Sequence, residues 1–139
     1  MIAGPVCGRT LASYGADVML VTSPHLANPP ALVMDTGLGK LSASLDLRRA
    51  ADTERLRQLI RACDVFCQSY RPGALARHGF APEDVARIRP GIVYVTLSAY
   101  GHTGPWQGRR GFETLIQSVT GMAHEQGLAA GADRPQHLP

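Results

Sequence analysis

The chain has 139 residues, of which 45% are hydrophobic and 18% are charged, and its formal net charge is +3. This length suits one domain with a core of its own and excludes a disordered tail or a disulfide-stapled mini-protein. No apolar run approaches the roughly 20 residues that a membrane-spanning helix needs, and the N-terminus lacks a secretory-signal pattern, so we expect a cytoplasmic protein that does not cross a membrane.

The polar residues exclude two further classes of protein. Lys40 is the only lysine among the 14 Lys and Arg residues, and the arginines are scattered among acids, whereas a nucleic-acid binder concentrates its cations on one face. Cys7, Cys63 and Cys67 form no Cys-x-x-Cys motif, and the histidines show no ligand spacing. We therefore expect no nucleic-acid partner, no metal, and free thiols in a reducing compartment.

The first third of the chain reads as a helix followed by strands. Pro5 suits a first helical position and Gly15 suits the left-handed position beyond a helix end. The apolar run that follows is typical of a buried strand, and the proline- and glycine-rich stretch after it predicts a long loop. The predicted elements are a helix over 5–14, a strand over 17–22, a loop over 23–39 and a strand over 41–47.

The clearest helical pattern comes next, over residues 50–63. Apolar side chains recur at i, i+3, i+4 and i+7, which makes one stripe, at Leu56, Leu59, Ile60 and Cys63. The β-branched run over 92–97 predicts a strand covered on both faces. The other predicted elements are a strand over 64–69, a brief helix over 71–79, a helix over 82–88, a Gly-rich loop over 101–111, a helix over 112–120, and no regular element from residue 121.

Strands that alternate with helices predict an α/β fold with a mostly parallel sheet and helices on both faces. We find no internal repeat and no interdomain linker, so residues 1–139 are predicted to be a single domain. A doubly wound unit begins with a strand, yet the first predicted element here is a helix, and the last residues add no closing element. We therefore expect the fold to be incomplete at both ends.

Three segments are predicted to meet at the carboxyl ends of the parallel strands, where such folds bind ligands. They are a helix start with free N–H groups, a strand end that holds hydroxyls and Arg71, with Arg77 soon after it, and a loop after the most buried strand. These segments are residues 3–5, 68–73 and 98–105. Together they suit a ligand with phosphate groups and an adenine ring. Singly, each is also compatible with an ordinary turn. No Gly-x-Gly-x-x-Gly, Walker A or Gly-x-Ser-x-Gly motif is present.

The same segments form an ordered series that resembles the class III CoA-transferase family, the CaiB/BaiF group, over nearly the whole chain. The matching motifs are Ala3-Gly4-Pro5, Tyr14-Gly15-Ala16-Asp17-Val18, Gly39-Lys40-Leu41-Ser42 with Leu45-Asp46-Leu47, Gln68-Ser69-Tyr70-Arg71-Pro72-Gly73 after Ala62 and Asp64-Val65, and Ser98-Ala99-Tyr100-Gly101-His102-Thr103-Gly104-Pro105. The whole series is far more specific than any one of its members.

The resemblance implies a Rossmann-like large domain, of which residues 1–139 form a CoA-binding part, in an enzyme that moves CoA from an acyl-CoA to a carboxylic acid. It implies acyl-CoA as substrate, no covalently bound cofactor, and an interlocked homodimer. By position, the family's CoA-lining residues fall on Ala3, Ser69, Tyr70, Arg77, Ser98 and Tyr100. For Arg77 and Ser98 the alternatives are a solvated helix residue and a turn hydroxyl.

Departures from the family pattern bear on activity. Thr22 replaces the usual acid after the strand, Leu41 replaces an arginine, and Ser69 replaces an asparagine. The family's nucleophile is an aspartate that forms a mixed anhydride and then an aspartyl thioester. Asp133 lies too early and in a turn-like setting to match it. We therefore expect no catalytic residue in this chain, and no activity from the chain alone.

Other readings remain open. The related α-methylacyl-CoA racemases carry a His-Asp pair where this chain has Phe112 and Glu113, and phenylalanine cannot exchange a proton, which disfavours racemisation. Glu113 is better read as a structural acid at a helix start. A CoA- or nucleotide-binding module without turnover, or a fragment that does not fold stably, are the further alternatives.

Overall fold

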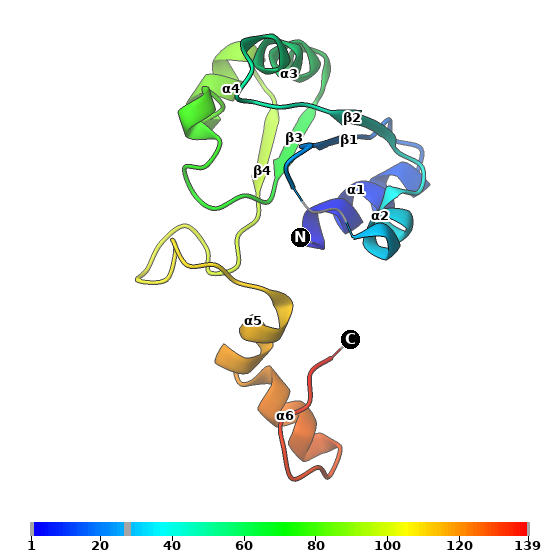
Figure 1. The fold of residues 1–139 in the computed structure, drawn as a ribbon, viewed down its shortest axis with the longest axis vertical. Coiled ribbons are helices and arrows are strands. Elements are labelled where there is room, and N and C mark those ends of the chain that lie inside the picture. The colour runs from blue at the N-terminus through cyan, green and yellow to red at the C-terminus, as the bar shows by residue number, and fades with distance from the viewer. Residues whose placement is uncertain (1, 27–28, 139) are drawn as a thin grey trace. The chain divides into compact units, whose positions relative to one another are not determined.

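A computed structural model describes residues 2–26 and 29–138. The chain divides into two compact units, one that ends at Leu97 and one that starts at Ser98, and each is described here by itself (Figure 1). The single domain that the sequence predicts over residues 1–139 stays a prediction. No helix among the described residues is long and apolar enough to span a bilayer.

The first unit opens with a helix and a parallel pair of strands. Helix α1 (Ala3–Ser13) leads to β1 (Met19–Thr22), and helix α2 (Pro30–Gly37) leads to β2 (Leu41–Ser44). The pair runs in register from Met19 opposite Leu41 to the last residue of each strand. The left-handed Gly15, which follows α1, confirms the predicted helix end (φ 93°).

The second strand pair of this unit is also parallel. Helix α3 (Ala50–Ala62) precedes β3 (Val65–Gln68), and the 3₁₀ turn η1 (Ala76–His78) and helix α4 (Pro82–Ile88) precede β4 (Val93–Thr96). Val65 lies opposite Val93 in the β3–β4 register. The predicted parallel α/β architecture is confirmed, in the form of two two-stranded pairs among the described residues.

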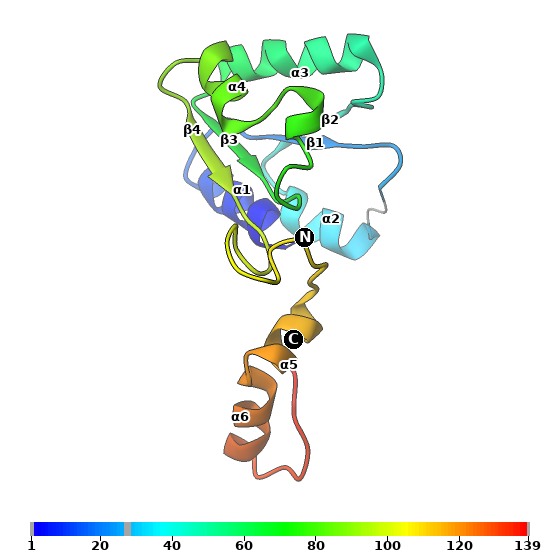
Figure 2. The ribbon, with the colours of Figure 1, turned by 90° about the vertical axis from the view of Figure 1, so that its left-hand side faces the viewer.

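The core of the first unit lies between the strands and helices α3 and α4. Its buried side chains include Ile60 on α3 and Phe80 and Val85 at α4. Residues from both strand pairs pack against it, namely Val21 of β1 and, from the other pair, Phe66 and Tyr94. Figure 2 shows α3 and α4 on one side of the strands and α1 and α2 on the other. The predicted apolar stripe of α3 is confirmed, because Leu56 and Ile60 are both buried.

The second unit holds two short helices after a long irregular segment. Helix α5 (Glu113–Val119) is followed by Gly121, whose left-handed backbone (φ 80°) leads the chain into α6 (Met122–Ala129). Gln117 is buried, and its amide donates to the carbonyl of Leu138 (3.2 Å). The last residues therefore fold back along α5.

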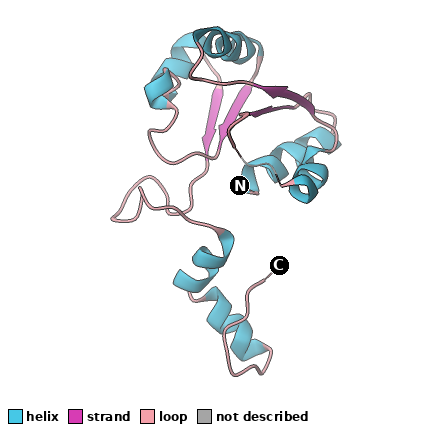
Figure 3. Cartoon of the chain, in the orientation of Figure 1, coloured by secondary structure: helices cyan, strands magenta, loops and turns pink. Residues whose placement is uncertain are grey.

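Three predictions of secondary structure are wrong, and tertiary contacts account for two of them, the unexpected helices α2 and α6. The predicted loop over 23–39 contains α2, which Pro30 opens and the Arg9–Asp35 ion pair (2.5 Å) ties to α1. Residues 27–28 of that loop lie outside the described residues. The predicted helix over 71–79 is reduced to the short η1 turn. Helix α6 lies where no element was expected, and Gln136 donates its N–H to Ala123 of that helix (2.8 Å) (Figure 3).

Candidate functional site

The N-terminal turn of α1 packs directly against the carboxyl end of β3. A Cβ atom on Gly4 would collide with the Ser69 hydroxyl, and it would lie 3.6 Å from the Leu97 side chain just after β4. Any larger residue at this position would require the Ser69 side chain to move. No side chain caps α1 among the described residues, so the positive helix end at Ala3 and Gly4 faces the strand ends with its first N–H groups available.

Gln68 fixes the turn that carries the polar residues after β3. Its amide nitrogen donates to the Thr96 hydroxyl (2.6 Å), and its amide oxygen accepts the backbone N–H of Tyr70 (2.7 Å). The ends of β3 and β4 and the start of the following loop are thereby joined by one side chain. Ser69 and Tyr70 are held at this edge as a result. Tyr70 keeps 40% of its surface exposed, although burial raises the pKa of its hydroxyl.

Two cations follow β3 without an acidic partner. Arg77 lies exposed in η1, and no acid among the described residues pairs with Arg77 or with Arg71. The arginines of α3 and α4, and Arg89 just after α4, differ because they pair with acids at 2.7–3.4 Å. The pairs are Arg55–Asp52, Arg57–Glu54, Arg61–Glu54, Arg87–Asp84 and Arg89–Asp64. Positive charge that the protein leaves uncompensated therefore follows the carboxyl end of β3.

The second unit holds the other two predicted site residues. The Tyr100 ring packs edge-on against Trp106 (5.3 Å between centroids), and the Arg109 guanidinium lies 4.8 Å from the centre of the Trp106 ring. Gly111 leaves room for this packing, since a Cβ there would lie 3.1 Å from the Tyr100 ring. The Ser98 hydroxyl is buried with no hydrogen-bond partner among the described residues. Buried hydroxyls are normally paired, so Ser98 is a site where a ligand could supply the missing bond.

The structure brings part of the predicted site together. Ala3 adjoins the Gly4–Ser69 contact, and Tyr70 follows Ser69 directly, so these residues share one edge of the first unit. Arg77 belongs to the same unit. Ser98 and Tyr100 belong to the second unit, and their sharing a site with the others stays a prediction.

A charged cluster after β1 and β2 was not predicted. The Asp46 carboxylate accepts hydrogen bonds from both the Nε and an Nη of Arg48 (2.9 Å each) and lies 3.1 Å from the His25 ring, which also contacts Arg48. The hydrogen bonds from Arg48 hold the pKa of Asp46 far below its usual range. An acid and an arginine two residues apart after a strand were the available signal, but His25 is distant in sequence.

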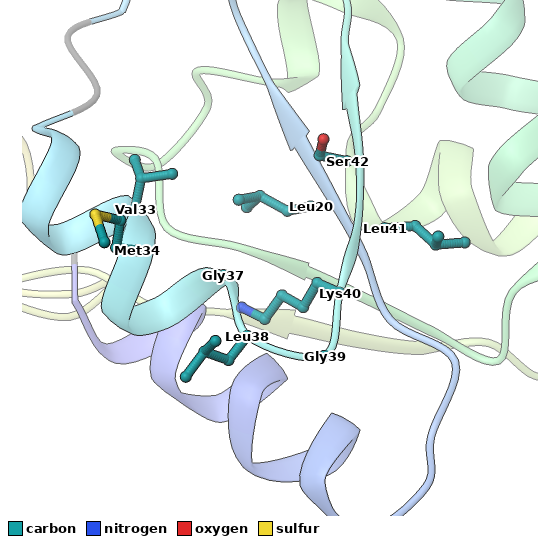
Figure 4. A pocket seen from close by; sticks show the side chains of 9 residues that line it. All are labelled: Leu20, Val33, Met34, Gly37, Leu38, Gly39, Lys40, Leu41 and Ser42. Carbon is teal, nitrogen blue, oxygen red and sulfur yellow. The ribbon is translucent and has the colours of Figure 1, made fainter.

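A cavity of about 400 Å³ lies between α2 and the β1–β2 pair (Figure 4). Its lining is mainly apolar and includes Leu20, Met34 and Leu41. Lys40 at its edge donates to the Pro5 carbonyl (2.6 Å), and burial lowers the pKa of its ammonium group. The residues that β2 contributes are at its amino end, so the cavity is separate from the strand ends that carry Ser69.

Known proteins share the sequence and the fold. A family model described as CoA-transferase family III matches residues 1–138. An acetyl-coenzyme A transferase of Hypoxylon pulicicidum is 38% identical over 96% of this chain and 23% of its own length. A succinyl-CoA:glutarate CoA-transferase of Homo sapiens is 29% identical over 94% of this chain and 33% of its own length.

Two solved structures resemble the chain closely. A CaiB/BaiF family protein from Brucella suis has a TM-score of 0.81 at 31% identity, over 88% of this chain and 36% of that one. A hypothetical protein from Mycobacterium tuberculosis has a TM-score of 0.83 at 28% identity, over 99% of this chain and 41% of that one. The chain thus spans well under half of these relatives. Because the family model covers nearly all of it, the chain belongs to CoA-transferase family III.

Proposed function

We propose that this chain supplies the CoA-binding part of an enzyme that transfers CoA from an acyl-CoA to a carboxylic acid. The observation that carries the proposal is the edge where the start of α1, without a side-chain cap among the described residues, meets Ser69, the residue before Tyr70. Helix N–H groups at such an edge bind phosphate oxygens, and Tyr70 offers an aromatic face for an adenine ring. The curated relatives named above are CoA-transferases, which supports the same chemistry.

The unpaired arginines fit the charge of this ligand. CoA carries several phosphate negative charges, and arginine binds phosphate oxygens through paired N–H groups. Arg77 has no acidic partner among the described residues, so its charge is available to a phosphate. We propose Ser98 and Tyr100 as further CoA contacts. The support is that Ser98 is buried without a partner in the described chain and that its preceding residue, Leu97, lies against Gly4.

The chemical step is proposed to use an aspartate that these 139 residues do not supply. The carboxylate would attack the acyl-CoA carbonyl and release CoA thiolate, which then attacks the mixed anhydride to give an aspartyl thioester and the free acid. The incoming carboxylate repeats the exchange and leaves as the new acyl-CoA. Asp133 is exposed in the turn after α6, which suits none of these steps. The chain's own residues would bind and orient CoA.

Titration calorimetry with CoA tests the binding proposal. The Arg77→Ala variant should weaken CoA binding about tenfold or more, because a charge-assisted hydrogen bond contributes about 1.5–3 kcal/mol. Arg87→Ala is the matched control, since Arg87 is an exposed arginine already paired with Asp84 (3.1 Å). Equal CoA affinities for the two variants would remove Arg77 from the site.

A second titration distinguishes recognition of the CoA phosphates from nonspecific binding of the rest of the molecule. Pantetheine has the thiol arm of CoA without its phosphates, so it should bind weakly to the natural chain and to Arg77→Ala alike. Tight binding of pantetheine would contradict a phosphate site at the α1 edge. Circular dichroism of each variant confirms that the comparison is made on folded protein.

We propose that the complete enzyme is a cytoplasmic, interlocked homodimer. The support is the apolar surface that this chain exposes, which includes Met34, Leu38 and Leu41 at and near α2 and β2. Sedimentation equilibrium of the longest soluble form of the protein tests the dimer. A monomer at micromolar concentration would contradict it.

A further inference from the structure

A cysteine of β3 faces helix α1. Phe66 packs against the core around α3 and α4, so the next side chain of the strand, Cys67, points to the opposite side of the strand layer. Helix α1 lies on that side (Figure 2). Ser69, two residues further on, points the same way, because its hydroxyl lies against Gly4 of α1. Cys67 therefore lies beneath α1, close to the Gly4–Ser69 contact.

A second cysteine lies on the strand-facing side of α1. Helix positions three and four residues apart share one face, so Cys7 and Gly8 follow Gly4 along the same side of the helix. The packing of Gly8 agrees, because a Cβ there would lie 3.3 Å from Val18, just before β1, and 3.1 Å from the Lys40 ammonium nitrogen. Cys7 thus lies one helical turn from the contact that α1 makes with the end of β3.

The Lys40 ammonium group joins the two thiols in one cluster. Lys40 donates to the Pro5 carbonyl (2.6 Å), which places its charge over the first turns of α1. Burial lowers the pKa of Lys40, and the Cys7 and Cys67 thiols both oppose that shift. Burial raises the pKa of Cys67, which Cys7 raises further and Lys40 opposes. Each of the three groups therefore acts on the others, and such interactions weaken with distance, so the three lie near one another.

The third cysteine is close to this cluster in sequence but not in the fold. Cys63 lies four residues before Cys67. Its thiol donates to the Ile60 carbonyl at the end of α3 (3.5 Å), and α3 lies on the opposite side of the strands from α1. The fold thus holds Cys67 near a cysteine that is distant in sequence. In an unfolded chain the short loop between Cys63 and Cys67 would favour their pairing instead.

We propose that Cys7 and Cys67 are a redox-sensitive pair that closes to a disulfide when a peroxide oxidises one of the two sulfurs. Both thiols are free and exposed, so a small oxidant can reach them. One thiolate attacks the peroxide, takes an OH group to become a sulfenic acid, and releases hydroxide. The other thiol attacks the sulfenic sulfur, so that the S–S bond forms and water leaves. The two electrons that the sulfurs lose reduce the peroxide O–O bond.

Disulfide mapping of the natural chain tests the pair. The folded chain is treated with hydrogen peroxide, the remaining thiols are blocked, and the chain is digested with chymotrypsin, which cleaves after Phe66 and so separates Cys63 from Cys67. Mass spectrometry should find the Cys7 and Cys67 peptides joined, with the loss of two hydrogen atoms, and dithiothreitol should release them. In concentrated urea this link should form about tenfold or more slowly, because the fold no longer holds the two thiols together.

Two variants complete the experiment. Cys63→Ser is the matched control, because it removes a thiol outside the pair, and it should leave the rate and yield of the Cys7–Cys67 link unchanged. Cys7→Ser should abolish the link and leave Cys67 singly oxidised, with circular dichroism showing that the variant is folded. A Cys63–Cys67 link in the folded natural chain, links only between two chains, or oxidation of the thiols without any link would overturn the proposal. The readout needs no CoA, so it is independent of the proposed function.

Discussion

Single residues in this chain differ in function mainly through their partners. Arg48 and Arg77 are both exposed arginines of the first unit. Arg48 donates two hydrogen bonds to Asp46, whereas Arg77 pairs with no acid in the described part of the chain. An arginine that is already paired with a carboxylate must lose that bond to bind an anion, so the free arginine is the stronger candidate for phosphate.

The Asp46 pair makes a prediction at the residue scale. Its carboxyl pKa is lower in the folded chain than in the unfolded chain, so the ionised carboxylate favours folding above the unfolded pKa of about 4, and this contribution is lost as pH falls below it. Asp46→Asn should therefore lower the urea midpoint at pH 7. The difference in urea midpoint between Asp46→Asn and the natural chain should become steadily smaller as the pH falls from 4 to 2.

Asp133→Asn is the matched control for this titration. Asp133 is exposed after α6, so its replacement should leave the urea midpoint unchanged at pH 7 and throughout the range from pH 4 to pH 2. A constant difference between Asp46→Asn and the natural chain across the acid range would mean that the carboxylate charge contributes nothing to folding.

At the scale of elements, the α4 region anchors the first unit. Val85 is completely buried (0% exposed) in the core. Val85→Ala removes two buried carbon atoms and leaves a cavity, so it should lower the free energy of unfolding by about 2 kcal/mol. Val93→Ala makes the same chemical change at a site that is 56% exposed and should lower it much less. Urea denaturation followed by circular dichroism measures both, and equal losses would contradict the core assignment.

Helix α6 offers a comparable test in the second unit. A Cβ on Gly127 would lie 2.5 Å from the Arg134 carbonyl oxygen, so the backbone itself must move to admit alanine. Gly127→Ala should therefore lower the free energy of unfolding of this unit by about 1–3 kcal/mol. Gly108→Ala is the control, because no atom lies within 4 Å of its Cβ position. Thermal unfolding should place the midpoint of Gly127→Ala below that of the control, and coincident midpoints would mean that this contact is not close in solution.

At the scale of the whole molecule, we expect each of these substitutions to change amide exchange only in the unit that contains it. All residues of the buried core around Val85 belong to the first unit. Val85→Ala should therefore speed amide exchange in β1 to β4, and Gly127→Ala should speed it in α5 and α6. NMR exchange maps of the two variants test this, and a map in which either substitution affects all amides equally would contradict the division.

Local pattern explains which parts of the fold could be predicted. The stripe of Leu56 and Ile60 and the β-branched run of β4 fix a helix and a strand through interactions near in sequence. Their alternation predicts parallel pairing, which the β1–β2 and β3–β4 registers confirm. Helix α2 was missed because Pro29 and Pro30 suggest a loop, whereas its contact with α1 comes from Arg9, far along the chain.

The candidate site, too, could be predicted from the sequence only where local interactions determine it. The sequence by itself determined the family motifs and the residue types at the strand ends, because Gly, Pro and hydroxyl residues act within a few positions of their neighbours. Only the tertiary structure decided that Gly4 approaches Ser69, that Asp46 holds His25 and Arg48, and that the Ser98 hydroxyl is buried unpaired. The physical reason is that contacts between distant segments depend on how helices and strands pack, and no local spacing encodes that packing.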